Sequence, residues 1–394
     1  MNLDSLRRTP NALAAEYSRF RVGERLLLTG HSHQAWPDVA REGQLAAFED
    51  AARDVDAKWE AASRMAEEVR VGVRALLADD GDIALGVNTH ELLVRFLSSV
   101  DIRRRPRLVT TDGEFHSARR QLARLAEEGI EVVRVPAAPA GTLAERLAAV
   151  VDDRTAAVLV SAVLFETARI VPGLDAVAAA CRSRGAELVV DAYHALGVFP
   201  LPLRELGLGD AWVLGGGYKY LQLGEGNCFL RLPPHAAGLR PVVTGWFAEF
   251  GTLAEEPDPD RVVYARGGDR FAGATYDPTS HYRAARVLRF RAERGLTPEF
   301  LRTVTQHQLG LLADRFDRLD LPESVITRDR GVPLTEFAGF LALRCRDAAG
   351  LRQALAERGV STDSRGEYLR LGPAPYLSDA QLESAIAALA TCCA

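Results

Sequence analysis

The sequence predicts an α/β protein with a mostly parallel seven-stranded sheet, followed by a smaller α+β domain. Between residues 83 and 232, short apolar runs alternate with helical stretches. This alternation is typical of a parallel sheet covered by helices on both faces. The 394 residues, 47% of them hydrophobic and 26% charged, are enough for a large core and two domains.

The individual elements follow from these runs. The apolar runs predict seven strands at 83–87, 107–110, 132–135, 156–160, 188–190, 211–214 and 228–232. The stretches between them predict helices, for example at 117–128, 143–150 and 174–184. Ligands of such sheets bind at the carboxyl ends of the strands, so residues just after these runs are the candidates for a site.

Three regions are predicted along the chain: an N-terminal arm (1–35), a large domain (36–275) and a small C-terminal domain (276–394). Helical spacing covers 38–78 and an arginine-rich stretch, 281–320. Residues 251–275 are rich in Gly, Pro and acids and predict a long connection. The small domain is expected from segments at 325–346, 351–358 and 380–391.

Charge and cysteine usage exclude several classes of protein. A net charge of −5 and a pI near 6.0 argue against binding to nucleic acid or to an anionic membrane. No run of 18 apolar residues predicts a membrane span, and the N-terminus has no apolar signal core. The five cysteines show neither a C-x-x-C pair nor metal-ligand spacing, which predicts free thiols, no metal site and a reducing cytoplasm.

Lysine is almost absent: of 48 basic Lys and Arg residues, only Lys58 and Lys219 are lysines. Arginine cannot replace lysine where a neutral amine must attack a carbonyl. Lys58 lies in a charged helical stretch, whereas Lys219 follows an apolar run and a glycine turn. Burial there would lower its pKa, so we interpret Lys219 as a Schiff-base lysine. A lysine extending from a loop into solvent is the alternative.

Two more residues point to the same chemistry. Asp191 ends an apolar strand, and His194 follows three residues later in D-A-Y-H-A-L-G. Asp191 and Lys219 end successive strands, which predicts that they lie at one edge of the sheet. An acid there could hold a pyridine nitrogen protonated; alone, it could equally cap a turn. Together, Lys219, Asp191 and His194 predict pyridoxal 5′-phosphate (PLP) as the cofactor.

Donors for the phosphate have several candidates. Asn88 and Thr89 follow a strand and a glycine and can begin a helix whose free N–H groups bind an anion. Tyr218 and Thr275 could donate hydroxyl groups, and Phe115 is placed to cover the ring. Each has a plainer alternative, a simple helix cap for the first pair and ordinary packing for the aromatic residues.

The C-terminal segment 364–376 carries Arg365 and Arg370. Arg370 alternates with two leucines, so its side chain is predicted to point away from the core face of its strand. It could hold an α-carboxylate with two parallel hydrogen bonds. The alternative is an exposed strand arginine.

In its motifs, the chain resembles kynureninase, a member of the class V aminotransferase-like group of fold type I PLP enzymes. The resemblance rests on D-A-Y-H-A-L-G, G-G-Y-K-Y-L, G-W-F (245–247), G-V-N-T-H-E-L-L, E-F-H-S and L-R-L-G-P-A-P-Y. It implies a homodimer with active sites at the subunit interface and a small amino-acid substrate. It also implies roles for seven residues. Around the ring of the cofactor, Lys219 carries the cofactor, Asp191 holds the ring nitrogen, His194 lies beside the ring and Phe115 stacks on it. Further out, Tyr218 binds the phosphate, Trp246 lies near the phosphate or substrate, and Arg370 binds the substrate carboxylate.

The chain departs from the family pattern around the distal part of the substrate. Polar residues stand there, namely His31, His33, Glu166 and Glu249. Of these, His33 and Glu166 are predicted to bind substrate, which favours a substrate with a hydrogen-bonding distal group.

The predicted activity is that of a kynureninase-like hydrolase, which cleaves a Cβ–Cγ bond to give alanine and an aryl acid. The alternatives are another class V PLP enzyme, namely an aminotransferase, an epimerase or a C–S lyase. Desulfuration through a loop cysteine is disfavoured, because the loop 359–367 has Ser364 and no cysteine. A non-enzymatic ligand-binding protein is a third possibility, against which the retention of Lys219 argues.

Overall fold

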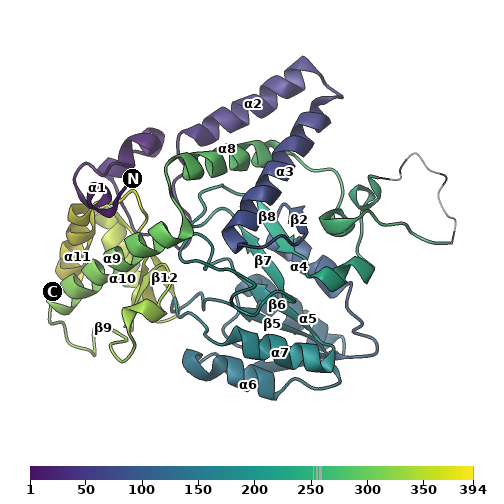
Figure 1. Ribbon diagram of the computed structural model, residues 1–394. Coiled ribbons are helices and arrows are strands. Elements are labelled where there is room, and N and C mark those ends of the chain that lie inside the picture. The colour runs from purple at the N-terminus through teal and green to yellow at the C-terminus, as the bar shows by residue number, and fades with distance from the viewer. Residues whose placement is uncertain (252, 254–255, 257–259, 394) are drawn as a thin grey trace.

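The computed structural model describes residues 1–251, 253, 256 and 260–393. Its centre is a seven-stranded sheet with the order β2-β8-β7-β6-β5-β3-β4 (Figure 1). Only β8 runs against its neighbours, and the other pairings are parallel. The strands are β2 (Ile83–Gly86), β3 (Arg107–Thr111), β4 (Glu131–Val135), β5 (Thr155–Ser161), β6 (Glu187–Asp191), β7 (Trp212–Gly216) and β8 (Cys228–Arg231).

All seven predicted strands are confirmed, as is the mostly parallel sheet. Each residue of β5, β7 and β8 is buried, because helices cover both faces of the sheet and leave no solvent side. The helices of this region are α2 (Val39–Arg53), α3 (Lys58–Leu77), α4 (Thr89–Leu97), α5 (His116–Glu127), α6 (Leu143–Ala149) and α7 (Leu174–Arg184).

The helical stretch predicted over 38–78 forms two helices rather than one. Asp54, after α2, leaves the helical conformation, and its carboxylate accepts hydrogen bonds from the backbone N–H groups of Asp56 and Ala57. Such local bonds compete with helix formation, so the chain turns there before α3 begins.

Residues 281–320 likewise form two helices, α8 (Thr279–Glu293) and α9 (Pro298–Asp317). Thr297 accepts a hydrogen bond from the Phe300 N–H group and Pro298 takes the first helical position, which together start α9. α8 lies against α2 so closely that a Cβ atom on Gly43 would come within 2.5 Å of the Tyr282 carbonyl oxygen.

The C-terminal part contains the sheet β12-β13-β10-β9, made of antiparallel pairs. The N-terminal arm packs with this C-terminal part of the chain, because β1 (Leu26–Leu27) pairs with β11 (Val360–Ser361) in a separate two-stranded sheet. Both chain ends lie on this side of the molecule (Figure 1). The predicted domain boundary at 275/276 stays a prediction. The remaining elements are α1 (Leu3–Arg7), β9 (Ile326–Arg328), β10 (Leu341–Cys345), α10 (Ala348–Glu357), β12 (Asp363–Arg365), β13 (Tyr368–Leu371) and α11 (Asp379–Cys393).

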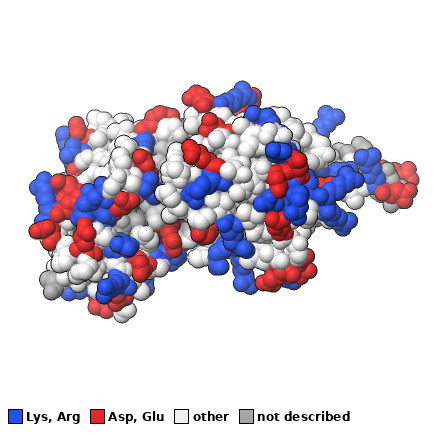
Figure 2. Space-filling model, turned by 90° about the horizontal axis from the view of Figure 1, so that it is seen from below, with Lys and Arg blue, Asp and Glu red and all other residues white. Residues whose placement is uncertain are grey.

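The surface carries both signs of charge. On the face shown in Figure 2, basic and acidic side chains are interspersed. Within the described residues, no helix has the length and apolar character needed to cross a membrane. The predicted connection over 251–275 lies partly outside the described residues; its described part includes the short helix η6 (Gly267–Phe271).

Candidate active site

A narrow chamber lies at the carboxyl edge of the large sheet. Its walls come from the ends of β5, β6 and β7 and from the starts of α4 and α5, because the carboxyl ends of parallel strands share one edge. Its free volume is about 30 Å³. The lining residues are Thr89, Leu93, Phe115, Ser117, Ala118, Ser161, Val163, Phe165, Asp191, Tyr193, His194, Leu214, Tyr218 and Lys219.

Lys219 is the reactive amine that this chamber encloses. The residue is only 6% exposed, and its Nζ atom lies 2.7 Å from Nε2 of His194. The ring centroids of Tyr193 and Phe115 are 4.7 Å and 5.1 Å from Nζ. Burial lowers the pKa of Lys219 to about 7, against the opposing charge of Asp191. A large share of the amine is therefore neutral near pH 7, as nucleophilic or basic chemistry requires. The solvent-exposed alternative for this lysine is wrong.

Asp191 supplies the acid at the same edge. Its Oδ1 atom accepts a hydrogen bond from the Tyr193 N–H group at 2.9 Å, so the residue does cap the turn after β6. Burial raises the pKa of Asp191, whereas that hydrogen bond and the charge of Lys219 lower it. The cap holds the carboxylate in place and leaves Oδ2 available, so the two interpretations of Asp191 are compatible.

His194 is a neutral imidazole in this setting. Burial, and next the charge of Lys219, lower its pKa well below the ordinary value. Its Nδ1 atom is buried without a hydrogen-bond partner. The ring thus has one nitrogen against the Lys219 amine and a second one open to a ligand.

The sequence analysis missed Glu114, although it stands in the E-F-H-S segment next to Phe115. Its carboxyl accepts hydrogen bonds from the hydroxyl groups of Thr111 and Ser161, at 2.7 Å and 2.6 Å, and from the Ser161 N–H group at 3.2 Å. Burial raises the pKa of Glu114 to about 7. This acid links the end of β3 to the end of β5, whose Ser161 pairs with Asp191 in the sheet.

Of the residues predicted to bind a phosphate, one group lies around the chamber and a second group lies outside it; the first group comprises Asn88, Thr89 and Tyr218. Thr89 and Tyr218 line the chamber, and Asn88 caps α4 by accepting a hydrogen bond from the Glu91 N–H group at 2.8 Å. His33, expected near the substrate, stacks on Tyr218 with ring centroids 5.0 Å apart. These four residues therefore lie together around one side of the chamber.

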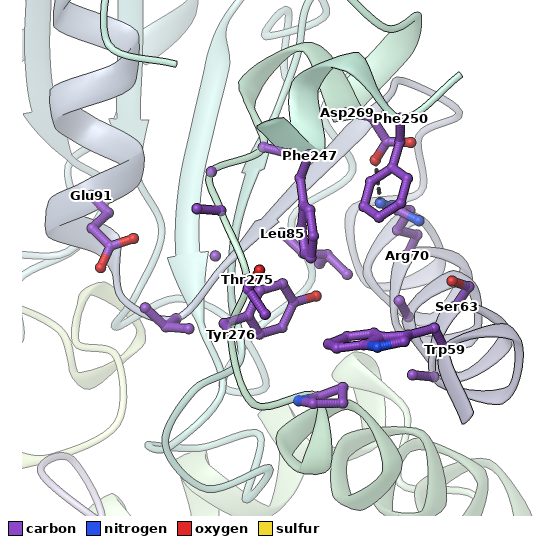
Figure 3. Close-up of a pocket in the computed structure, with 18 of the residues that line it drawn as sticks. Trp59, Ser63, Arg70, Leu85, Glu91, Phe247, Phe250, Asp269, Thr275 and Tyr276 are labelled. Atoms are coloured by element: carbon purple, nitrogen blue, oxygen red, sulfur yellow. Dashed lines mark hydrogen bonds and ion pairs between the residues drawn. The ribbon is translucent and has the colours of Figure 1, made fainter. Parts of the chain in front are cut away.

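Trp246 and Thr275 do not line this chamber. The Trp246 indole donates a hydrogen bond to the Thr275 hydroxyl at 3.1 Å, and the Trp246 residue is 46% exposed. Thr275 lines a separate cavity of about 650 Å³. There, the rings of Trp59, Phe247 and Tyr276 converge, beside an Arg70–Asp269 ion pair (Figure 3).

Glu166 also lies elsewhere. It is exposed and lines a third cavity, of about 910 Å³, together with Arg169 and Tyr368. Its neighbour Phe165 points into the chamber instead. Glu249 belongs to the short helix η5 (Trp246–Glu249). Neither acid is among the residues that line the Lys219 chamber.

Arg370 is buried, with only 3% of the residue exposed, so the exposed-arginine alternative is wrong. Its Nη1 atom donates to the Phe165 carbonyl oxygen at 2.6 Å, and Nη2 donates to the Asp363 carboxylate. The guanidinium lies 5.5 Å from the Phe340 ring. Its Nε atom has no partner, so one donor is open for a substrate.

These residues fit PLP chemically. A partly neutral amine, an acid at the same edge and aromatic rings around the amine are what the aldehyde, the ring nitrogen and the ring faces need. The start of α4 offers N–H groups to a phosphate.

Part of the chain matches a known family model and one curated protein. Residues 49–219 match the family model of class-V aminotransferases. A mitochondrial cysteine desulfurase of Arthroderma benhamiae is 29% identical over 157 residues, or 40% of this chain and 31% of that protein. The match thus spans about a third of that curated relative.

Solved structures match over nearly the whole chain. A lysine-to-alanine mutant of C-DES, with glycine covalently linked to its PLP cofactor, has a TM-score of 0.83 at 18% identity and covers 95% of this chain and 98% of that one. The cystine C–S lyase C-DES with its product cysteine persulfide gives 0.80 at 18% identity, covering 93% and 97%. An apo cysteine desulfurase of Thermococcus onnurineus NA1 gives 0.78 at 18% identity, covering 94% and 95%.

The chain therefore has the fold of the fold type I PLP-dependent enzymes, and the stretch that matches the class-V aminotransferase model ends at Lys219. The fold predicted from sequence is confirmed, and the predicted cofactor is the one that neighbours of this fold carry. The narrower resemblance to kynureninase is not supported, because the relatives reported above are desulfurases and a C–S lyase.

Proposed function

We propose that this protein is a PLP-dependent lyase that cleaves the Cβ–S bond of a sulfur-containing amino acid without a cysteine of its own. The observation that carries the proposal is the buried amine of Lys219, held at one sheet edge with Asp191, in a chamber whose described lining contains no cysteine. The likeness to a cystine C–S lyase supports it.

Each residue has a task in this proposal. PLP, when bound, supplies an electron sink for negative charge at Cα of the substrate. Lys219 accepts the α-proton at Nζ, because its lowered pKa leaves the amine partly neutral. Asp191 holds a proton at the pyridine nitrogen, Phe115 covers one ring face, and Arg370 binds the substrate carboxylate.

Further residues hold the phosphate group of PLP. Thr89 and Tyr218 bind the phosphate, Asn88 contributes by capping the start of α4, and His33 backs Tyr218. Overall, the α-proton is removed, the Cβ–S bond breaks, and the sulfur leaves with the bonding electron pair and takes up a proton. A disulfide amino acid such as cystine and one water then give cysteine persulfide, pyruvate and ammonia.

The cysteines argue for direct elimination rather than transfer of sulfur to the enzyme. Cys228 does not line the chamber but lies behind it: its Sγ atom is 3.8 Å from the hydroxyl of Tyr193, which does line it. Burial raises the pKa of Cys228 to about 12, so it stays a thiol and a poor nucleophile. Cys181 and Cys345 are also buried.

A kynureninase-like hydrolase is the second candidate. It is favoured by the kynureninase-like segment L-R-L-G-P-A-P-Y, whose Arg370 lies buried near the chamber. In this candidate, the same amine and acid would serve the cleavage of a Cβ–Cγ bond. Glu166 would not contact the substrate unless the chain rearranged, because it lines another cavity.

The proposal includes a homodimer. The resemblance implies active sites at the subunit interface, and in such a dimer Trp246 and Thr275 would reach the Lys219 chamber of the second copy, since they do not line their own. Apolar side chains exposed on this part of the chain, including Phe250 and Val242, support an interface there. A monomeric mass for the PLP-loaded protein in light scattering would contradict it.

The test uses the two lysines as a matched pair. PLP is added to the wild type and to Lys219→Ala and Lys58→Ala, and the visible absorption spectrum is recorded. We expect the visible band of lysine-bound cofactor in the wild type and in Lys58→Ala only. An unchanged spectrum in Lys219→Ala would overturn the assignment of the site.

Substrates then separate the two candidates. Release of pyruvate and persulfide from L-cystine supports the lyase. Anthranilate fluorescence from L-kynurenine, without pyruvate from cystine, supports the hydrolase instead.

A further inference from the structure

A second group of polar side chains surrounds Phe340, next to the Lys219 amine. The His31 ring lies 4.6 Å and the His194 ring 6.2 Å from the Phe340 ring, by centroids, and the Arg370 guanidinium lies 5.5 Å away. Since His194 also contacts Lys219, the group borders on the point where a substrate amine would react. We call it the Phe340 cluster: His31, His194, Phe340, Asp363, Arg365 and Arg370.

Buried polar atoms without a partner collect in and beside this cluster, within the described part of the chain. Buried polar groups are nearly always hydrogen-bonded, so a concentration of open ones indicates a place for a polar ligand. These atoms are both ring nitrogens of His31, Nδ1 of His194, the hydroxyl groups of Tyr220 and Thr362, and Nε of Arg365 and of Arg370.

Asp363 lies between the two arginines. It accepts a hydrogen bond from Nη2 of Arg370, and its Oδ1 atom lies 3.3 Å from Nη1 of Arg365. Its Oδ2 atom is 3.6 Å from Nε2 of His31. Burial opposes ionisation of Asp363, but the contact with His31 and the charge of Arg370 hold its pKa well below the usual range.

The charge of the cluster follows from these contacts. Burial lowers the pKa of His31 to about 4, and His194 is neutral for the same reason. Two guanidinium groups and one carboxylate remain charged near pH 7. The cluster therefore carries one net positive charge, which one substrate carboxylate would balance.

We propose that Asp363 is a specificity-determining residue, which fits this subsite to the one α-carboxylate at the reacting end of the substrate and disfavours compounds that bring a second carboxylate into the same subsite, as a short dicarboxylate would. The inference rests on the proposed function, in which Arg370 binds the substrate carboxylate. By cancelling one guanidinium charge, Asp363 leaves enough positive charge for one anion, and its own carboxylate repels a second.

The test measures binding of propionate and succinate to the PLP-loaded protein by calorimetry. Neither acid has an amine, so neither reacts with the cofactor. We expect the wild type to prefer propionate, and Asp363→Asn to shift the affinity ratio toward succinate by roughly tenfold. Asp329→Asn is the matched control, because that exposed aspartate pairs with Arg169 in the neighbouring cavity; it should leave the ratio unchanged.

An affinity ratio that stays the same in a folded Asp363→Asn protein would overturn the inference, as would a wild type that prefers succinate. Should Asp363→Asn not fold, Arg365→Gln tests the same charge count: it should weaken both acids by roughly tenfold, and unchanged binding would contradict the inference. The same two acids are also titrated into the protein without PLP, where calorimetry records their affinities although no visible band forms, so a failure of the cofactor assignment is distinguishable from a failure here.

Discussion

The Lys219 chamber and the Phe340 cluster border on each other but are built in opposite ways. The chamber takes its residues from successive strand ends of one sheet, and it controls charge by burial, which makes an amine partly neutral. The cluster joins the N-terminal arm, β12 and β13, and it keeps three charged groups by pairing them. Burial thus creates reactivity in one region, and pairing preserves binding charge in the other.

Removing a charge from the cluster should cost the most stability. Arg370→Ala would leave Asp363 without its main partner, which costs about 3–5 kcal/mol for a buried pair. The double variant Arg370→Ala/Asp363→Ala should recover part of this loss, because the carboxylate that lost its main partner is removed as well. Urea unfolding measures both. Equal losses in the single and double variants would show that the pairing is not what stabilises the cluster.

A charge removed from the chamber should affect chemistry rather than folding. Asp191→Asn keeps the cap on Tyr193 but not the negative charge, so turnover should fall by about 10² or more, with a change of less than about 1 kcal/mol in unfolding free energy. Turnover of L-cystine and urea unfolding are the measurements. A variant as active as the wild type would remove Asp191 from the site.

The pH dependence of stability sharpens the contrast. The folded-state pKa of Glu114 is raised by burial from 4.5 to about 7, so the folded state binds the proton more tightly than the unfolded state. The stabilisation of the folded state by this proton on Glu114 is complete below about pH 4.5 and is lost as pH rises toward 7.

Glu114→Gln should therefore gain stability relative to the wild type, by roughly 2–3 kcal/mol, across this window. Urea unfolding at several pH values measures the difference. A difference that does not change with pH would mean that Glu114 is ionised throughout.

The smallest effect is expected at the phosphate side. Thr89→Val removes one hydroxyl donor while keeping the shape, so PLP should bind roughly tenfold more weakly. Asn88→Ser, which keeps a cap for α4, should bind PLP with nearly wild-type affinity. Titration of the visible band gives both values; equal affinities for the two variants would exclude Thr89 as a ligand.

The sequence could reveal the chamber because strand ends are local features. Each apolar run ends within a residue or two of its predicted position, and parallel strands bring their ends to one edge. Asp191 and Lys219 were therefore placed together before any distance was known. The retention of lysine at 219 added the chemistry, because only an amine can serve there.

The cluster could not be found in this way, because its members come from four separate segments, at residues 31, 194, 340 and 363–370. Asp363 stood in the loop noted for its lack of cysteine, and nothing local shows that it pairs with Arg370. Likewise, Thr275 was predicted as a phosphate donor but lines another cavity, and Trp246, expected near the phosphate or substrate, is hydrogen-bonded to it there.

The sequence by itself determined the fold, the reactive amine and its acid, since hydrophobic periodicity and residue type act over a few residues. The tertiary structure decided which charges are paired, which polar atoms remain open and which side chains share a cavity. Those properties depend on burial and on contacts between segments hundreds of residues apart, such as the 3.6 Å approach of His31 to Asp363.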